Sequence, residues 1–150
     1  MDDDDNKFYL HVALALSGCQ LVEQQLKLYI AEALELVAKR LDGQLPFSMQ
    51  GSNYDDASLE RLINTFKMLS NEPQLLADLN KFKDERNFLS HRAITTCLDP
   101  EGNRQLDISD ELEPRLQNIR READRLYWKI NEAANKFRGN LYFDPVPEGT

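Results

Sequence analysis

A short polar segment inside a predicted helix carries the residues best suited to chemistry. Arg86, Asn87, Ser90 and His91 fall within six consecutive positions. Histidine exchanges a proton near neutral pH, so it can take one from a ribose 2′-hydroxyl or give one to a leaving oxygen. Arginine presents a planar set of donors that fits phosphate oxygens and stabilises charge in a transition state. The segment therefore suits cleavage of an RNA phosphodiester without a metal.

The spacing predicts an unusual place for the arginine. On a helix that turns about 100° per residue, a series of apolar residues falls within about 60° of Arg86; these are Leu75, Leu79, Phe82, Leu89, Ala93 and Cys97. Asn87 and His91 lie four residues apart on one flank. An unpaired guanidinium in an apolar seam costs several kcal/mol. We therefore expect Arg86 to meet a carboxylate, a polar subunit interface or an anionic ligand.

The candidate roles need more than one histidine. His91 is assigned to proton transfer, Arg86 to binding the phosphate and the transition state, Asn87 to orientation and Ser90 to an added hydrogen bond. Cleavage by acid and base needs two proton-transfer roles, whereas each chain offers one histidine here. A twofold dimer that pairs the two segments would supply both roles.

Four predicted helices position this segment. Apolar residues at helical spacing predict helices over residues 7–41, 56–69, about 71–98, and from Ser109 or Glu113 to Gly139. Gly43 with Pro46, and Asp99 with Pro100, mark breaks. The last helix alternates apolar steps of four and three, which is typical of a packed seam. We predict an all-α, antiparallel four-helix bundle with elaborated loops, forming a single domain over residues 1–150 with a surface tail at 140–150.

Composition narrows the class of protein. The net charge of -8 argues against broad nucleic-acid binding, so no DNA partner is expected, although a local basic site for RNA remains compatible. Cys19 and Cys97 are predicted to be small buried residues of a reduced, cytoplasmic protein. The acidic start is unlike a signal peptide, and the longest apolar run is too short for a bilayer. Neither a glycine-rich phosphate loop nor a metal-binding pattern is present in the sequence, so no cofactor or metal is expected.

The motif resembles that of a known superfamily. An arginine followed by Asn, three further residues and His, late in a helix of an all-helical domain, is similar to the signature of the higher eukaryotes and prokaryotes nucleotide-binding (HEPN) superfamily. Arg86, Asn87 and His91 match that signature at its shortest spacing. The resemblance implies a helical, HEPN-like bundle that forms a homodimer with both motifs at the interface. It also implies metal-independent endoribonuclease activity on single-stranded RNA or tRNA, as a toxin or defence effector with a cognate antitoxin.

The chain departs from the family pattern at one position. Toxins of this superfamily that pair with a nucleotidyltransferase antitoxin often carry a tyrosine two residues after the histidine, whereas this chain has Ala93 there. Control by modification of that tyrosine is therefore not expected. Arg92, directly after His91, would instead add positive charge beside the site.

Three other interpretations remain open. The chain can be a non-catalytic HEPN-like dimer that binds a nucleotide or a partner protein. It can also be a structural adaptor, for which the regular seam of the last helix is the main argument. Finally, Arg86 and His91 can belong to a structural polar network, with Arg86 paired to Glu85 or to an acid from another helix. The basic residues of the last helix, from Arg115 to Lys129, are assigned to a solvated face.

Overall fold

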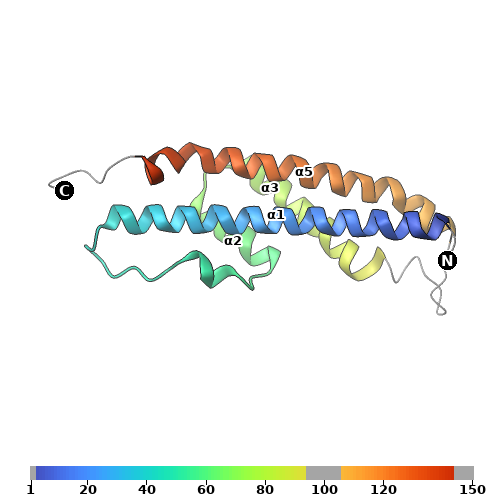
Figure 1. Ribbon diagram of the computed structural model, residues 1–150, viewed down its shortest axis with the longest axis horizontal. Helices are drawn as coiled ribbons and strands as arrows, with labels where there is room; N and C mark the ends of the chain where they lie inside the picture. Colours follow the sequence, from blue (N-terminus) through green and yellow to red (C-terminus); the bar gives the residue numbers. More distant parts are fainter. Residues whose placement is uncertain (1–2, 94–105, 144–150) are drawn as a thin grey trace.

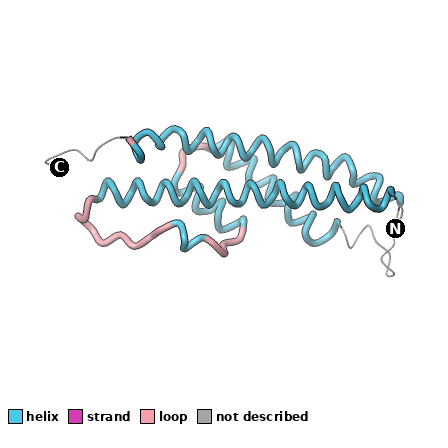
Figure 2. Tube along the Cα trace, in the orientation of Figure 1, coloured by secondary structure: helices cyan, strands magenta, loops and turns pink. Residues whose placement is uncertain are grey.

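The chain folds as an all-α bundle, as the sequence predicts. The computed structural model describes residues 3–93 and 106–143, with side chains over 6–91 and 112–143. Its elements are α1 (Asp3–Leu41), the 3-10 turn η1 (Gly51–Tyr54), α2 (Leu59–Leu69), α3 (Pro73–Phe88), the π-helical segment η2 (Leu89–Ala93) and α5 (Leu106–Tyr142) (Figure 1). No strand occurs in the described ranges, and the longest described loop joins α1 to α2 (Figure 2).

The two longest helices, α1 and α5, lie side by side and run in the same direction (Figure 1). Near one end, Nε2 of His11 lies 3.1 Å from a carboxylate oxygen of Glu113. Near the other end, Nζ of Lys39 donates a hydrogen bond of 3.0 Å to the carbonyl of Leu141. The contacts therefore advance along both helices together, which defines a parallel pair.

Helix α3 provides the antiparallel packing of the bundle. Glu85, late in α3, pairs with Arg115, early in α5. Asp78, which is earlier in α3, pairs with Arg125, which is later in α5. The chain thus returns along α3 toward the start of α1 before α5 begins. This return is the reason that α1 and α5 are parallel to each other while α3 opposes both.

The regular apolar seam of α5 is buried inside the single chain. Seven of the eight seam positions are buried, and the eighth, Phe137, packs partly buried against the same core. The buried seven are Leu112, Leu116, Ile119, Ala123, Leu126, Ile130 and Ala133. Gly18 of α1 lets the helices approach closely, because a Cβ atom placed there would lie 3.0 Å from Cβ of Ala123. The seam is therefore core, as predicted, and the adaptor interpretation loses its main argument.

Local interactions set two helix ends, one as predicted and one not. Helix α1 ends before Gly43, as the sequence predicts, and both Asp42 and Gly43 have positive φ values, of 48° and 76°. Helix α2 begins at Leu59 rather than at residue 56, because the Ser58 hydroxyl accepts a hydrogen bond from the Arg61 amide and caps the helix there.

The prediction that Gly139 ends the last helix, with a tail from residue 140, is wrong. Helix α5 continues to Tyr142. Leu141 is buried, and the Tyr142 hydroxyl donates a hydrogen bond of 3.0 Å to Glu32. These contacts outweigh the cost of about 1 kcal/mol for glycine inside a helix.

Part of the prediction falls on residues that are not described. The expected end of the third helix at Leu98, with Cys97, Asp99 and Pro100, lies outside the described residues, as do residues 144–150 of the predicted tail. Within the described ranges, no helix combines the length and the apolar character needed to cross a bilayer.

Candidate functional site

The apolar stripe predicted for α3 exists, but Arg86 lies at its border with solvent rather than among the buried side chains. Leu75, Leu79 and Phe82 of α3 and Leu89 of η2 are buried in the core. The side chain of Arg86 is 35% exposed, so its guanidinium is not fully buried. Arg86 is therefore a boundary residue between core and solvent rather than a buried charge.

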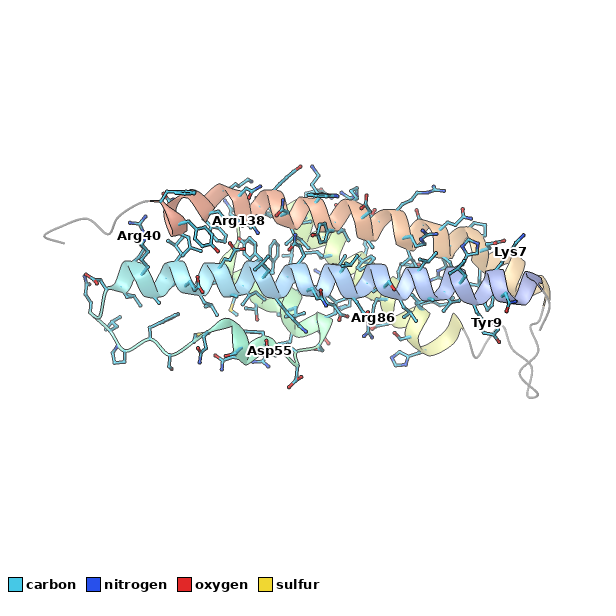
Figure 3. The ribbon with its side chains drawn as sticks, viewed as in Figure 1. Lys7, Tyr9, Arg40, Asp55, Arg86 and Arg138 are labelled. Carbon is cyan, nitrogen blue, oxygen red and sulfur yellow. The ribbon has the colours of Figure 1, made fainter. Side chains whose placement is uncertain are left out.

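A carboxylate from another helix partners Arg86. Nε of Arg86 lies 3.3 Å from Oε1 of Glu23, on α1. Figure 3 shows Arg86 beside α1. A carboxylate was one of the three kinds of partner expected for Arg86. An acidic residue from another helix is also what the structural-network interpretation requires. Glu85, which that interpretation also named, pairs with Arg115 instead.

The charge of Arg86 reaches a buried thiol on α1. Burial raises the pKa of Cys19 to about 11, the positive charge of Arg86 lowers it, and the negative charge of Glu23 raises it again. The guanidinium therefore lies on the side of α3 that packs against α1. Cys19 is a free, buried thiol, as predicted, and its protonated form is inert toward nucleophilic chemistry at neutral pH.

His91 and Asn87 line an open hollow on another side of α3. The hollow has a volume of about 500 Å³ and is formed by Asp84, Asn87, Phe88, His91 and Arg115. Asn87 and His91 are both exposed to solvent. The prediction that these two side chains share one flank agrees with this arrangement, even though His91 lies in the π-helical segment η2 rather than in a continuous α-helix.

The arginine beside His91 in this hollow is Arg115 of α5. Its Nε and Nη2 atoms donate hydrogen bonds of 2.8 Å each to the two carboxylate oxygens of Glu85. Its guanidinium stacks 3.5 Å from the ring centroid of Phe88. The hydrogen bonds to Glu85 raise the pKa of Arg115, so it remains a cation. The sequence placed Arg115 on a solvated face, and no pattern within a single helix indicates that α5 would carry it to α3.

The structure thus separates the predicted site residues into two groups within one chain. Asn87 and His91 share the hollow with Arg115, whereas Arg86 turns toward Glu23 and is not part of the hollow's lining. Ser90 is exposed in η2. The backbone of Arg92 lies in the same segment, and its side chain lies outside the described residues.

The chemistry available in the hollow is that of a proton-transfer group beside charged and polar side chains. Imidazole can exchange a proton, Asn87 can donate or accept a hydrogen bond, and Arg115 supplies a fixed positive charge. Asp84 adds a carboxylate to the rim. Among the side chains that the structure describes, no group of three or more His, Cys, Asp or Glu is placed to hold a metal ion.

Comparison with known proteins adds no relative: no family model, curated protein or solved structure matches the chain.

Proposed function

We propose that this protein is a metal-independent endoribonuclease of the HEPN type, which cleaves single-stranded RNA or tRNA at a site shared by two copies of the chain. The observation that carries the proposal is the open hollow that contains His91 and Asn87 next to a guanidinium. A proton-transfer residue that faces solvent beside positive charge is what phosphodiester cleavage requires. The toxin or defence role, with a cognate antitoxin, belongs to the same proposal through the motif.

The division of the site residues favours a shared site over a single-chain site. Within one chain, Arg86 faces Glu23 and does not line the hollow of His91. Arg86 is nevertheless partly exposed, so a second copy packed over the end of α3 can bring its own Arg86 to a phosphate held near His91. In this arrangement His91 transfers the proton, Arg86 binds the phosphate, and Asn87 orients the imidazole or the substrate.

A non-catalytic binding module is the second candidate, and one observation favours it. Two arginines whose side chains are described near the segment have carboxylate partners, because Arg86 pairs with Glu23 and Arg115 pairs with Glu85. An incoming phosphate must compete with these carboxylates, and the net charge of -8 adds to that competition. A nucleotide or a partner protein with its own cationic groups would be bound in the same hollow without cleavage.

The experiment is cleavage of a labelled single-stranded RNA and of bulk tRNA in the presence of EDTA. We expect His91→Ala to lower the rate about 100- to 10,000-fold, and Arg86→Ala about 100- to 1,000-fold, because each removes a group that acts in the transition state. His11→Gln is the matched control, since His11 is the other histidine of the chain and pairs with Glu113 away from the hollow. It should cleave at the native rate.

Two results would overturn the ribonuclease proposal. One is no cleavage by the pure native protein, and the other is equal cleavage by all variants, which would indicate a contaminating nuclease. Retained binding of RNA or of a nucleotide by a non-cleaving native protein, lost in Arg115→Ala, would support the binding module. Circular dichroism of each variant establishes that loss of activity is not loss of fold.

A further inference from the structure

The outward face of α1 carries a row of exposed leucines. Leu14, Leu21 and Leu28 are spaced seven residues apart, and their side chains are 36%, 52% and 46% exposed. They lie about 100° to 140° around α1 from the buried core residue Ala15. In Figure 1 no other helix lies in front of α1. Single exposed leucines are ordinary, whereas a row at heptad spacing is a helix-pairing surface.

Residues of opposite charge continue the same seven-residue spacing at the two ends of the row. Lys7 lies seven residues before Leu14, and Glu35 lies seven residues after Leu28, and both are exposed. We call the five positions from Lys7 to Glu35 the α1 heptad row. A seven-residue step drifts by about 20° on a straight helix, so the two charged ends lie about 40° to either side of Leu21. A left-handed crossing of about 20°, the usual geometry of heptad seams, brings such a row into register.

We propose that the α1 heptad row binds a second copy of this chain, antiparallel, with the twofold axis at Leu21. In that pairing Leu21 meets Leu21 of the second copy, Leu14 meets Leu28, and Lys7 meets Glu35 at both ends. Parallel pairing would place Lys7 on Lys7 and Glu35 on Glu35, which repel. The row is therefore complementary to itself in one direction only, and this selects a second copy over an unrelated partner.

A groove beside the row gives the second copy room to pack. It lies between α1 and α5, has a volume of about 380 Å³, and is formed on the α1 side by Leu14, Ser17, Gly18 and Leu21. Tyr127 and Trp128 form part of the α5 side, and Trp128 is itself exposed. Apolar and aromatic groups along the edge of the row enlarge the surface that a second copy buries.

This surface is separate from the candidate site. Glu23, the partner of Arg86, lies about 160° around α1 from Leu21. Pairing through the α1 heptad row therefore leaves Arg86 and the hollow of His91 open. The inference does not rest on the proposed function and would hold for a non-catalytic chain. A chain that uses both surfaces, with the two twofold axes crossing at a right angle, forms a tetramer, and one that uses only the α1 heptad row forms a dimer.

Cysteine cross-linking tests the register. Only a residue on the twofold axis meets itself, so Leu21→Cys should form a covalent dimer under mild oxidation, on a non-reducing gel. Leu14→Cys alone should not, whereas an equal mixture of Leu14→Cys and Leu28→Cys should form a mixed dimer. The native chain, with its own two cysteines, sets the background. Equal cross-linking of all single variants, or none by Leu21→Cys, would overturn the proposal.

Light scattering tests the energetics. Leu21→Arg should halve the molecular mass of the native assembly, since it places two like charges at the axis. Met68→Arg adds the same charge at an exposed apolar residue of α2 and should leave the mass unchanged. Lys7→Glu should raise the dissociation constant about three- to tenfold, and Lys7→Glu with Glu35→Lys should restore it. An unchanged mass in Leu21→Arg, or no rescue by the double change, would refute the antiparallel pairing.

Discussion

Two arginines pair with glutamates of α1, and they differ in almost every other respect. Arg86 of α3 meets Glu23 through one nitrogen at 3.3 Å and is 35% exposed. Arg138 of α5 donates to Glu32 through Nε at 3.0 Å and through Nη2 at 2.8 Å, and Glu32 is only 5% exposed. Figure 3 shows Arg86 beside the middle of α1 and Arg138 near its end. One pair is a loose surface contact, and the other is an interhelical clamp.

Both residues of the Arg138–Glu32 clamp make further hydrogen bonds to neighbouring side chains. Nη1 of Arg138 donates hydrogen bonds of 2.7 and 2.8 Å to the side chains of Asn131 and Asn135. The Tyr142 hydroxyl donates to Glu32 as well. Hydrogen bonds to Glu32 raise the pKa of Arg138. A charge that donates from all three guanidinium nitrogens contributes to specificity of packing, whereas a partly exposed charge with a single contact can exchange its partner for a ligand.

The largest effect should follow from breaking the clamp. Arg138→Ala leaves the Glu32 carboxylate buried without its cation, and we expect a loss of about 3–5 kcal/mol in the free energy of unfolding. Urea unfolding followed by circular dichroism measures it. Replacing both residues, with Glu32→Leu and Arg138→Met, should recover most of that loss, because no buried charge remains. A loss below about 1 kcal/mol in Arg138→Ala would show that the clamp is not structural.

An intermediate effect should appear at high pH in the same region. The Tyr29 hydroxyl donates a hydrogen bond of 2.9 Å to the Leu69 carbonyl, and its ring packs edge-on against Phe66 and Phe137. Burial, and then the charge of Glu72, raise the pKa of Tyr29 to about 12. Because the unfolded tyrosine loses its proton near pH 10, the unfolded state binds fewer protons above that pH, and stability falls as pH rises from about 10 to 12.

We expect Tyr29 to account for about 1–2 kcal/mol of that loss, allowing for solvent screening. Unfolding free energies of the native chain and of Tyr29→Phe, measured in urea between pH 8 and 11.5, give the two slopes. Tyr29→Phe should be less stable than the native chain at pH 8, because it lacks the hydrogen bond. Its unfolding free energy should fall less steeply as the pH rises to 11.5. Identical slopes would show that Tyr29 titrates normally in the folded chain.

The smallest effect should come from the loose pair. Arg86→Ala is expected to cost less than about 1 kcal/mol of unfolding free energy, because a partly exposed ion pair contributes little beyond the solvation of its groups. Glu23→Gln should lower the unfolding free energy by a similarly small amount. Because this variant keeps the Arg86 side chain, it measures loss of the ion pair apart from loss of the aliphatic part of the arginine. A cost above about 2 kcal/mol in both variants would make Arg86 a structural residue and would weaken its assignment to phosphate binding.

The sequence predicted the elements better than the contacts between them. The stripe of Leu79, Phe82 and Leu89 was confirmed because each position follows from the turn of a single helix. The shared flank of Asn87 and His91 was likewise local. Arg115 was missed as a neighbour of His91, because its position depends on how α5 packs against α3. No spacing within either helix encodes that distance.

Helix ends show the same limit. Gly43 ended α1 as predicted, since its backbone conformation suits that residue by itself. Gly139 did not end α5, because Leu141 and Tyr142 gain contacts with α1 that a local rule does not include. The outcome at a glycine therefore depends on whether the following residues find partners elsewhere in the fold.

The sequence by itself determined the all-α class, the regular apolar spacing of α5, and the need of Arg86 for a polar partner, because these follow from periodicity and from the cost of an unpaired charge. The tertiary structure alone decided that Glu23 is the partner of Arg86, that Arg115 joins His91, and that α1 and α5 are parallel. Partner choice depends on distances between helices that are remote in the chain, and those distances exist only once the core has packed.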